Sequence, residues 1–75
     1  MKLKQIRPKD LLKALVKSGF EVKRQKGSHV FLEKSTQTKK YFTSISLHRE
    51  PLAKGTLRAI LKQTGIPEDK LKDLL

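Results

Sequence analysis

The spacing of apolar residues changes twice along the chain, from helical to strand-like and back, which leaves few possible folds. The first helical segment runs from Pro8 to Ser18. Pro8 suits the first helical position, Asp10 lies favourably in the first turn, and Gly19 can take the left-handed conformation that ends a helix. The face that this segment would bury carries Leu11, Leu12, Leu15 and Val16.

The segment from Phe20 to Leu47 is rich in β-branched and aromatic residues and has no helical period. The run Lys26 to Ser28 is typical of a tight turn between two strands of a hairpin. The segment therefore predicts an antiparallel meander. Its expected strands are Phe20 to Gln25, His29 to Glu33 and Lys39 to Leu47, with a polar loop at Lys34 to Thr38.

Both faces of the second expected strand carry apolar residues, so its orientation has to be chosen. Successive side chains of a strand point to opposite faces. We expect Val30 and Leu32 to face the helices, which would leave His29 and Phe31 towards the open face or an edge.

The last third of the chain returns to helical spacing. His48 to Lys54 contains Pro51 and is expected to be a loop, and Gly65 would end the helix that follows it. Pro67 would open a short final helix. The helix between this loop and Gly65 is indicated by the spacing of Leu57, Ile60, Leu61 and Thr64. The final helix is indicated by Glu68 and Asp69 in its first turn and by an apolar stripe of Leu71, Leu74 and Leu75. Strands flanked by helices predict an α+β fold with the helices on one face of the sheet.

Length and charge limit the classes of function. The 75 residues predict a single domain, 1–75, and 18 Lys and Arg against 7 Asp and Glu leave a net charge of +11. Such an excess favours binding to nucleic acid, with an acidic protein as the other option. The chain has no cysteine for disulfides and no apolar run near the about 20 residues of a membrane span. Met1 to Gln5 lacks the apolar core of a secretion signal, so we expect a soluble, cytoplasmic protein.

Two histidines, His29 and His48, are the candidates for acid–base chemistry, because imidazole exchanges protons near neutral pH. His29 directly follows the expected turn. There, backbone N–H groups of Gly27 and Ser28 could meet an anion, and Lys26 adds positive charge. Cleavage of RNA needs little more, since the ribose 2′-hydroxyl supplies the nucleophile and an acid–base pair with a cation completes the reaction.

A metal site is not expected. DNA hydrolysis normally uses metal ions held by converging carboxylates or histidines. The acids Glu68, Asp69 and Asp73 cluster on the expected final helix, where the helix start already explains their position. We therefore expect no metal and no cofactor.

The motifs as a set resemble the HicA family of toxin–antitoxin systems. The resemblance lies in Gln25 to His29, in Leu52 to Ile66, in the helix end at Ser18 to Phe20 and in His48, and it covers nearly the whole chain. It implies a fold like the double-stranded-RNA-binding domain and a metal-independent messenger-RNA endonuclease. It also implies neutralisation by a HicB-type antitoxin that covers the active surface.

The family's catalytic histidine corresponds to His29, and His48 matches a second histidine that is frequent in the family. Two short stretches differ from the common family pattern, Ser46 to His48 and Ala53 to Thr56. The expected catalytic residue is His29, with His48, Ser28 and Gly27 as possible auxiliaries. The expected phosphate-binding residues are Lys26, Arg24, Lys23 and Arg58.

Two other functions fit parts of the pattern. A non-catalytic RNA-binding module of the same fold would bind RNA without needing His29. A helix-turn-helix DNA-binding protein is suggested by the spacing of Leu61, Gly65 and Leu71, but acids on the would-be reading helix would repel phosphates.

The sequence leaves open the cleavage-site preference, a requirement for the ribosome and the oligomeric state. Extensive base stacking is not expected, because the chain has only four aromatic residues: Phe20, Phe31, Tyr41 and Phe42.

Overall fold

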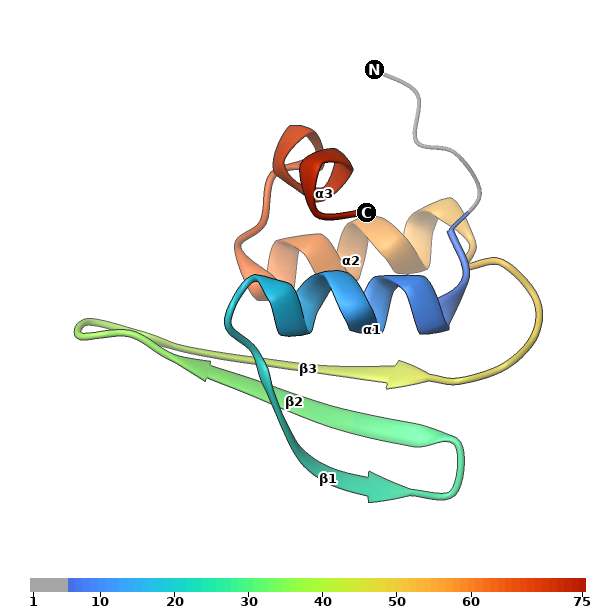
Figure 1. Ribbon diagram of the computed structural model, residues 1–75, viewed down its shortest axis with the longest axis horizontal. Coiled ribbons are helices and arrows are strands. Elements are labelled where there is room, and N and C mark those ends of the chain that lie inside the picture. Colours follow the sequence, from blue (N-terminus) through green and yellow to red (C-terminus); the bar gives the residue numbers. More distant parts are fainter. Residues whose placement is uncertain (1–5) are drawn as a thin grey trace.

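A computed structural model describes residues 6–75, in which three helices lie on one face of a three-stranded antiparallel sheet (Figure 1). This confirms the predicted α+β fold, like that of the double-stranded-RNA-binding domain. The expectation for Met1 to Gln5 falls outside the described residues. The elements are α1 (Pro8–Lys17), β1 (Glu21–Lys26), β2 (His29–Ser35), β3 (Lys40–Ser46), α2 (Lys54–Thr64) and α3 (Glu68–Leu74).

Helix α1 ends at Gly19 in a left-handed conformation, as predicted. Gly19 has φ 109°, and the amide of Phe20 donates to the carbonyl of Leu15 across 3.0 Å. The amide of Gly19 donates to Val16, which completes a Schellman motif. Phe20 therefore precedes β1 instead of opening it, and its side chain is only 2% exposed. Val16, expected on the buried face, is 49% exposed, because the helix buries the neighbouring stripe of Leu11, Ala14 and Leu15.

The sheet has the order β1-β2-β3. Lys26 pairs with His29 across a two-residue turn, in which Gly27 has φ 60° and Ser28 a negative φ. This is the pattern of a type II′ hairpin, whose first central position favours glycine. The predicted turn is thus confirmed.

Strand β2 is longer than expected. Lys34 and Ser35 pair with Tyr41 and Lys40, although the sequence placed them in a loop. Two contacts explain the extension. Lys34 Nζ donates to the Ser18 carbonyl at 2.8 Å, and Thr36 closes the following turn through hydrogen bonds with Lys39.

The core lies between the sheet and the helices. Val30 and Leu32 are 1% and 2% exposed, while Phe31 between them is 41% exposed, which confirms the predicted orientation of β2. Successive positions thus alternate between the helix-covered face and the open face of the sheet. The buried apolar core comprises Ile6, Leu11, Ala14, Leu15, Phe20, Val30, Leu32, Ile45, Leu57, Ile60, Leu61 and Leu71.

The two C-terminal helices complete the helical side of the core, with α3 packed on α1 on the side away from the sheet (Figure 1). Gly65 ends α2 with φ 71°, and α3 buries Leu71 completely. Leu75, expected in the apolar stripe of α3, is 54% exposed, because the helix ends at Leu74. Among residues 6–75, every helix is too short or too polar to cross a membrane.

Candidate active site on the open sheet face

His29 begins β2, directly after the hairpin turn, and its side chain is exposed. It shares the open face with Phe31, since Val30 between them faces the core. The turn thus holds an imidazole at one end of the sheet, on the side away from the helices.

A serine from the neighbouring strand holds the imidazole of His29. His29 pairs with Ser46 in the β2–β3 register, and the distance from His29 Nδ1 to Ser46 Oγ is 3.0 Å. The hydroxyl can donate to a bare Nδ1 or accept from a protonated one. With Nδ1 occupied, Nε2 is the ring nitrogen left for chemistry.

Two cations accompany His29 on the open face. Lys26 is its cross-strand partner in β1, and Arg24 pairs with Phe31 one step further along the sheet. Directly opposed residues in a sheet project to the same face. The end of the face that carries His29 therefore bears two basic side chains, while the opposing positions in β3 are serines, Ser44 and Ser46.

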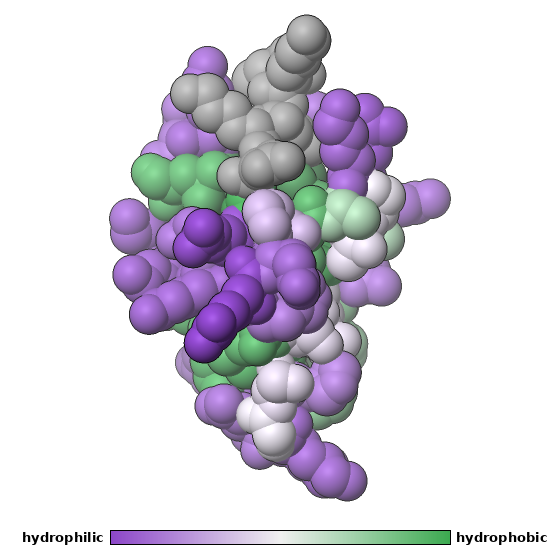
Figure 2. Space-filling model, turned by 90° about the vertical axis from the view of Figure 1, so that its right-hand side faces the viewer, coloured by the Kyte–Doolittle hydropathy of each residue, from purple (hydrophilic) through white to green (hydrophobic). Residues whose placement is uncertain are grey.

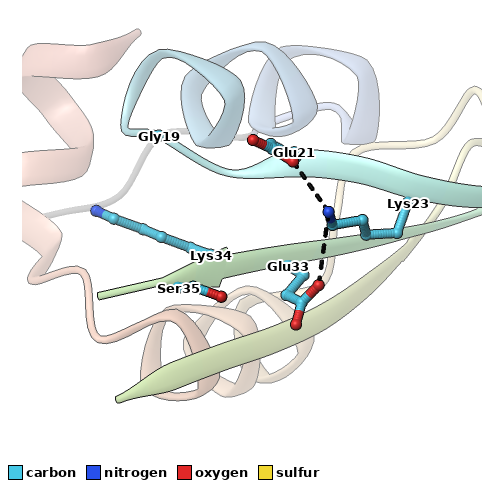
Figure 3. A pocket seen from close by; sticks show the side chains of 6 residues that line it. All are labelled: Gly19, Glu21, Lys23, Glu33, Lys34 and Ser35. Carbon is cyan, nitrogen blue, oxygen red and sulfur yellow. Dashed lines mark ion pairs between the residues drawn. The ribbon is translucent and has the colours of Figure 1, made fainter. Parts of the chain in front are cut away.

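The acidic residues of the open face lie at the end away from His29, and they form ion pairs with lysines. Glu21 opposes Glu33, and Lys23 Nζ lies 3.0 Å from Glu21 and 3.8 Å from Glu33 (Figure 3). Lys40 also approaches Glu33, at 3.8 Å. A register shift between Val22 and Arg24 brings Lys23 to this position. The electrostatic result is a neutralised end with the glutamates and a positive end with His29.

The predicted phosphate-binding residue Lys23 thus lies between two carboxylates. Its pKa is raised, chiefly by the hydrogen bond with Glu21 and then by the charge of Glu21; burial opposes this, and the charge of Glu33 adds the weakest effect. Lys23 is therefore engaged with acids, whereas Lys26 and Arg24 lie at the end with His29.

The turn residues Gly27 and Ser28 lie beside His29, as expected. The Ser28 carbonyl accepts from the amide of Leu47 at 2.6 Å, which fastens the turn to the segment after β3. Among residues 6–75, no hydrogen bond is made by the backbone N–H of Gly27 or Ser28, so both can meet an anion.

The second histidine lies at the same end of the molecule but in different surroundings. His48 follows β3 by two residues, and its Nδ1 lies 3.7 Å from a carboxylate oxygen of Glu50. It lines an open depression of about 550 Å³ that reaches the start of α1. Figure 2 looks onto this end of the molecule, where hydrophilic residues predominate around smaller apolar patches. The other lining residues are Arg7, Lys9, Leu12, Leu47 and Arg49.

The predicted phosphate-binding residue Arg58 lies elsewhere. It is on α2, in the layer of helices, and its Nε lies 3.7 Å from Glu68 at the start of α3. The fold therefore brings His29, Lys26, Arg24, Gly27 and Ser28 together, but does not bring Arg58 to them.

Ser46 is the residue of this site that sequence reasoning missed. Its position opposite His29 depends on the pairing of β2 with β3. The turn at Gly27 sets the register of β1 against β2 only, and the Thr36–Lys39 turn that sets the second register relies on a side chain. No signal in the sequence alone would have found it.

Comparisons with known proteins bear on this arrangement. A family model described as the HicA toxin of bacterial toxin–antitoxin systems matches residues 8–66. The match spans α1, the whole sheet and α2, and it contains both histidines. A search among curated proteins found no match. Within the described residues, no three His, Asp or Glu side chains converge as metal ligands do.

Proposed function

Because the chain belongs to the HicA toxin family of bacterial toxin–antitoxin systems, we propose that it is an endoribonuclease that cleaves messenger RNA with His29 as the acid–base group. One observation carries the proposal: His29 is exposed at the positive end of the open sheet face, with Nδ1 3.0 Å from Ser46 Oγ. A general base needs an oriented nitrogen within reach of its substrate, and Nε2 of His29 meets that need.

The first step uses the nucleophile that RNA itself carries. In the tautomer whose Nδ1–H donates to Ser46, Nε2 of His29 takes the proton of a ribose 2′-hydroxyl. The 2′-oxygen bonds to phosphorus, and the bond from phosphorus to the 5′-oxygen breaks. The products are a 2′,3′-cyclic phosphate and a 5′-hydroxyl. One proton leaves the 2′-oxygen and one reaches the 5′-oxygen, so the reaction needs no other reactant.

Fixed positive charge stabilises the phosphorane-like transition state. Lys26 opposes His29 directly and Arg24 opposes Phe31, so both cations flank a phosphate bound at the imidazole. The amides of Gly27 and Ser28 add oriented dipoles. His29 can return its proton to the departing oxygen. For His48 to act as the acid instead, the segment after β3 would have to carry it round to the open face.

The test compares the wild-type protein with His29→Ala on a labelled RNA in the presence of a chelator. Removing an acid–base group lowers the rate by about 10²- to 10⁴-fold, and RNA affinity should change little. Lys62→Ala, an exposed charge change on α2, is the matched control and should cleave as the wild type does. Circular dichroism and thermal unfolding establish that each variant is folded.

Product analysis tests the chemistry separately. The wild type should leave 2′,3′-cyclic phosphates, and a single 2′-deoxy nucleotide at the cleavage site should block cutting there. Equal cleavage by His29→Ala would remove His29 from catalysis, and cleavage that needs added Mg²⁺ would refute the metal-independent reaction. RNA binding without cleavage by the wild type would favour the non-catalytic RNA-binding module.

We propose further that a HicB-type antitoxin neutralises the protein by covering the open face around His29. The family supports an antitoxin partner in general. The positive end of the face, with Lys26 and Arg24, suits an acidic partner. Lys26→Glu should weaken the complex with the antitoxin by more than Lys62→Glu does. Equal affinities would move the interface elsewhere.

A further inference from the structure

The open sheet face carries two large aromatic side chains that the core does not use. Phe31 is 41% exposed and Phe42 is 61% exposed, whereas Phe20 is only 2% exposed. The exposed part of each ring gains nothing from burial, so folding alone does not account for two large aromatic residues at these positions. They lie on the same sheet face as His29, which favours a role in binding a ligand at that face.

The β2–β3 register makes Phe31 and Phe42 diagonal neighbours. Phe31 pairs with Ser44, and Phe42 lies two residues before Ser44 on β3. Aromatic side chains in such diagonal positions reach one another. Both phenylalanines line one shallow depression of about 380 Å³, together with Ser44 between them on the sheet and Gln63 from α2. The two exposed rings thus lie side by side in one depression of the open face.

The surrounding charges select the occupant. Arg24 opposes Phe31, and His29 precedes Phe31 by two residues on β2. Glu33, which opposes Phe42, is within 3.8 Å of both Lys23 and Lys40, so its charge is compensated. A ligand that fits must combine flat apolar groups with a negative backbone. Single-stranded nucleic acid has this combination, because its bases are free to stack on aromatic rings.

We propose that Phe31 and Phe42 form a base-stacking platform that binds single-stranded RNA beside His29. The proposal rests on the proposed function, since it assigns the position of the substrate at that same site. The two-residue step from His29 to Phe31 spans about 7 Å along the strand. A base on Phe31 therefore belongs to a nucleotide adjoining the phosphate at His29. A duplex is excluded from this platform because its bases are already stacked on one another.

The first experiment reports stacking directly. The chain contains no tryptophan, so Phe42→Trp introduces a single fluorescent probe. The ligand is a 2′-O-methylated oligouridylate of eight nucleotides, which has no 2′-hydroxyl to attack and stays intact whatever the activity. Its abasic counterpart is the control ligand. We expect quenching by the oligouridylate and little by the abasic strand. Equal quenching by both would overturn the platform.

The second experiment measures what the rings contribute. Phe31→Ala and Phe42→Ala should each weaken binding of the oligouridylate by about 5- to 100-fold, since stacking on an aromatic ring contributes on that scale. Val16→Ala is the matched control, because Val16 is an exposed apolar residue on α1. Unchanged affinity in both phenylalanine variants would refute the proposal.

Three further outcomes separate this inference from the proposed function. If the wild type cleaves unmodified RNA but the phenylalanine variants bind and cleave as it does, the platform alone is refuted. If the variants lose affinity for the antitoxin and keep their affinity for RNA, the two rings form a protein-docking surface, which also overturns the inference. Base-dependent binding without any cleavage would support the platform and refute the nuclease.

Discussion

His29 and Ser46 face each other across β2 and β3, with 3.0 Å between Nδ1 of the imidazole and Oγ of the serine. Ser46 is half-buried, whereas the imidazole is exposed. The side chain of Ser46 is therefore less free to move than the imidazole that it contacts. We infer that Ser46 is a positioning residue, which directs Nε2 of His29 towards the substrate.

Ser46→Ala should lower kcat for RNA cleavage by about 5-fold, because one neutral hydrogen bond is worth about 1 kcal/mol. KM should stay close to its wild-type value, since Ser46 is not assigned to the substrate. Ser46→Thr keeps the hydroxyl and should restore most of the rate. An equal loss in the alanine and threonine variants would show that packing, and not the hydrogen bond, matters here.

Lys26→Gln should reduce the salt dependence of RNA binding. Each phosphate neutralised on a single strand contributes about 0.7 to the slope of log affinity against log salt concentration. Removing the charge of Lys26 should lower that slope by about this amount. The measurement is a salt titration with the 2′-O-methylated oligonucleotide. Lys62→Gln should leave the slope unchanged, and an equal change in both variants would argue against a specific contact at Lys26.

The fold could be predicted from local signals that act over a few residues. Pro8 and Gly19 mark the limits of α1, and Gly27 marks the hairpin, because each glycine has a positive φ that other residues avoid. The alternation at Val30 and Leu32 gives the buried face of β2. These signals suffice for the order and layering of the elements.

The site depends on longer-range geometry that such signals do not contain. The partner of His29 is set by a turn that Thr36 closes with its side chain, and this turn also lengthens β2. The loop after β3 has no regular spacing of apolar residues, so the surroundings of His48 could not be predicted. Lys23 and Lys26 have different surroundings because of a register shift within β1, and no residue pattern predicts that shift.

Alkaline pH should reveal the ion pair of Lys23. Its raised pKa in the folded state means that the contribution to stability is complete below the ordinary lysine pKa of about 10.4 and is lost as pH rises through the folded-state pKa. Lys23→Gln should therefore lower Tm near pH 8, and the difference from the wild type should shrink at higher pH.

The double variant with Glu21→Gln is the control for this pH effect. Glu21 is the main cause of the raised pKa of Lys23, so the pH-dependent difference should be much smaller when Glu21 is already neutral. A difference of the same size in both backgrounds would mean that Lys23 stabilises the fold through its aliphatic chain.

Gly55 in α2 and Gly65, which directly follows the helix, should respond to alanine in opposite directions. Gly65 has φ 71°, and a Cβ there would lie 2.9 Å from Cε1 of Tyr41, whereas a Cβ at Gly55 meets nothing within 4 Å. Gly65→Ala should cost about 2 kcal/mol or more, because left-handed backbone strain and crowding of the ring add. Gly55→Ala should stabilise by about 0.5 kcal/mol, because it restricts the unfolded chain.

Gly27→Ala separates the two causes at Gly65. Gly27 also has a positive φ, 60°, but its Cβ position is open. Its alanine variant should therefore show the strain without the clash, a loss of about 1 kcal/mol. Urea unfolding gives all three free energies. If Gly65→Ala is no more costly than Gly27→Ala, the ring of Tyr41 moves aside freely, and the packing of α2 against β3 is looser than the 2.9 Å contact indicates.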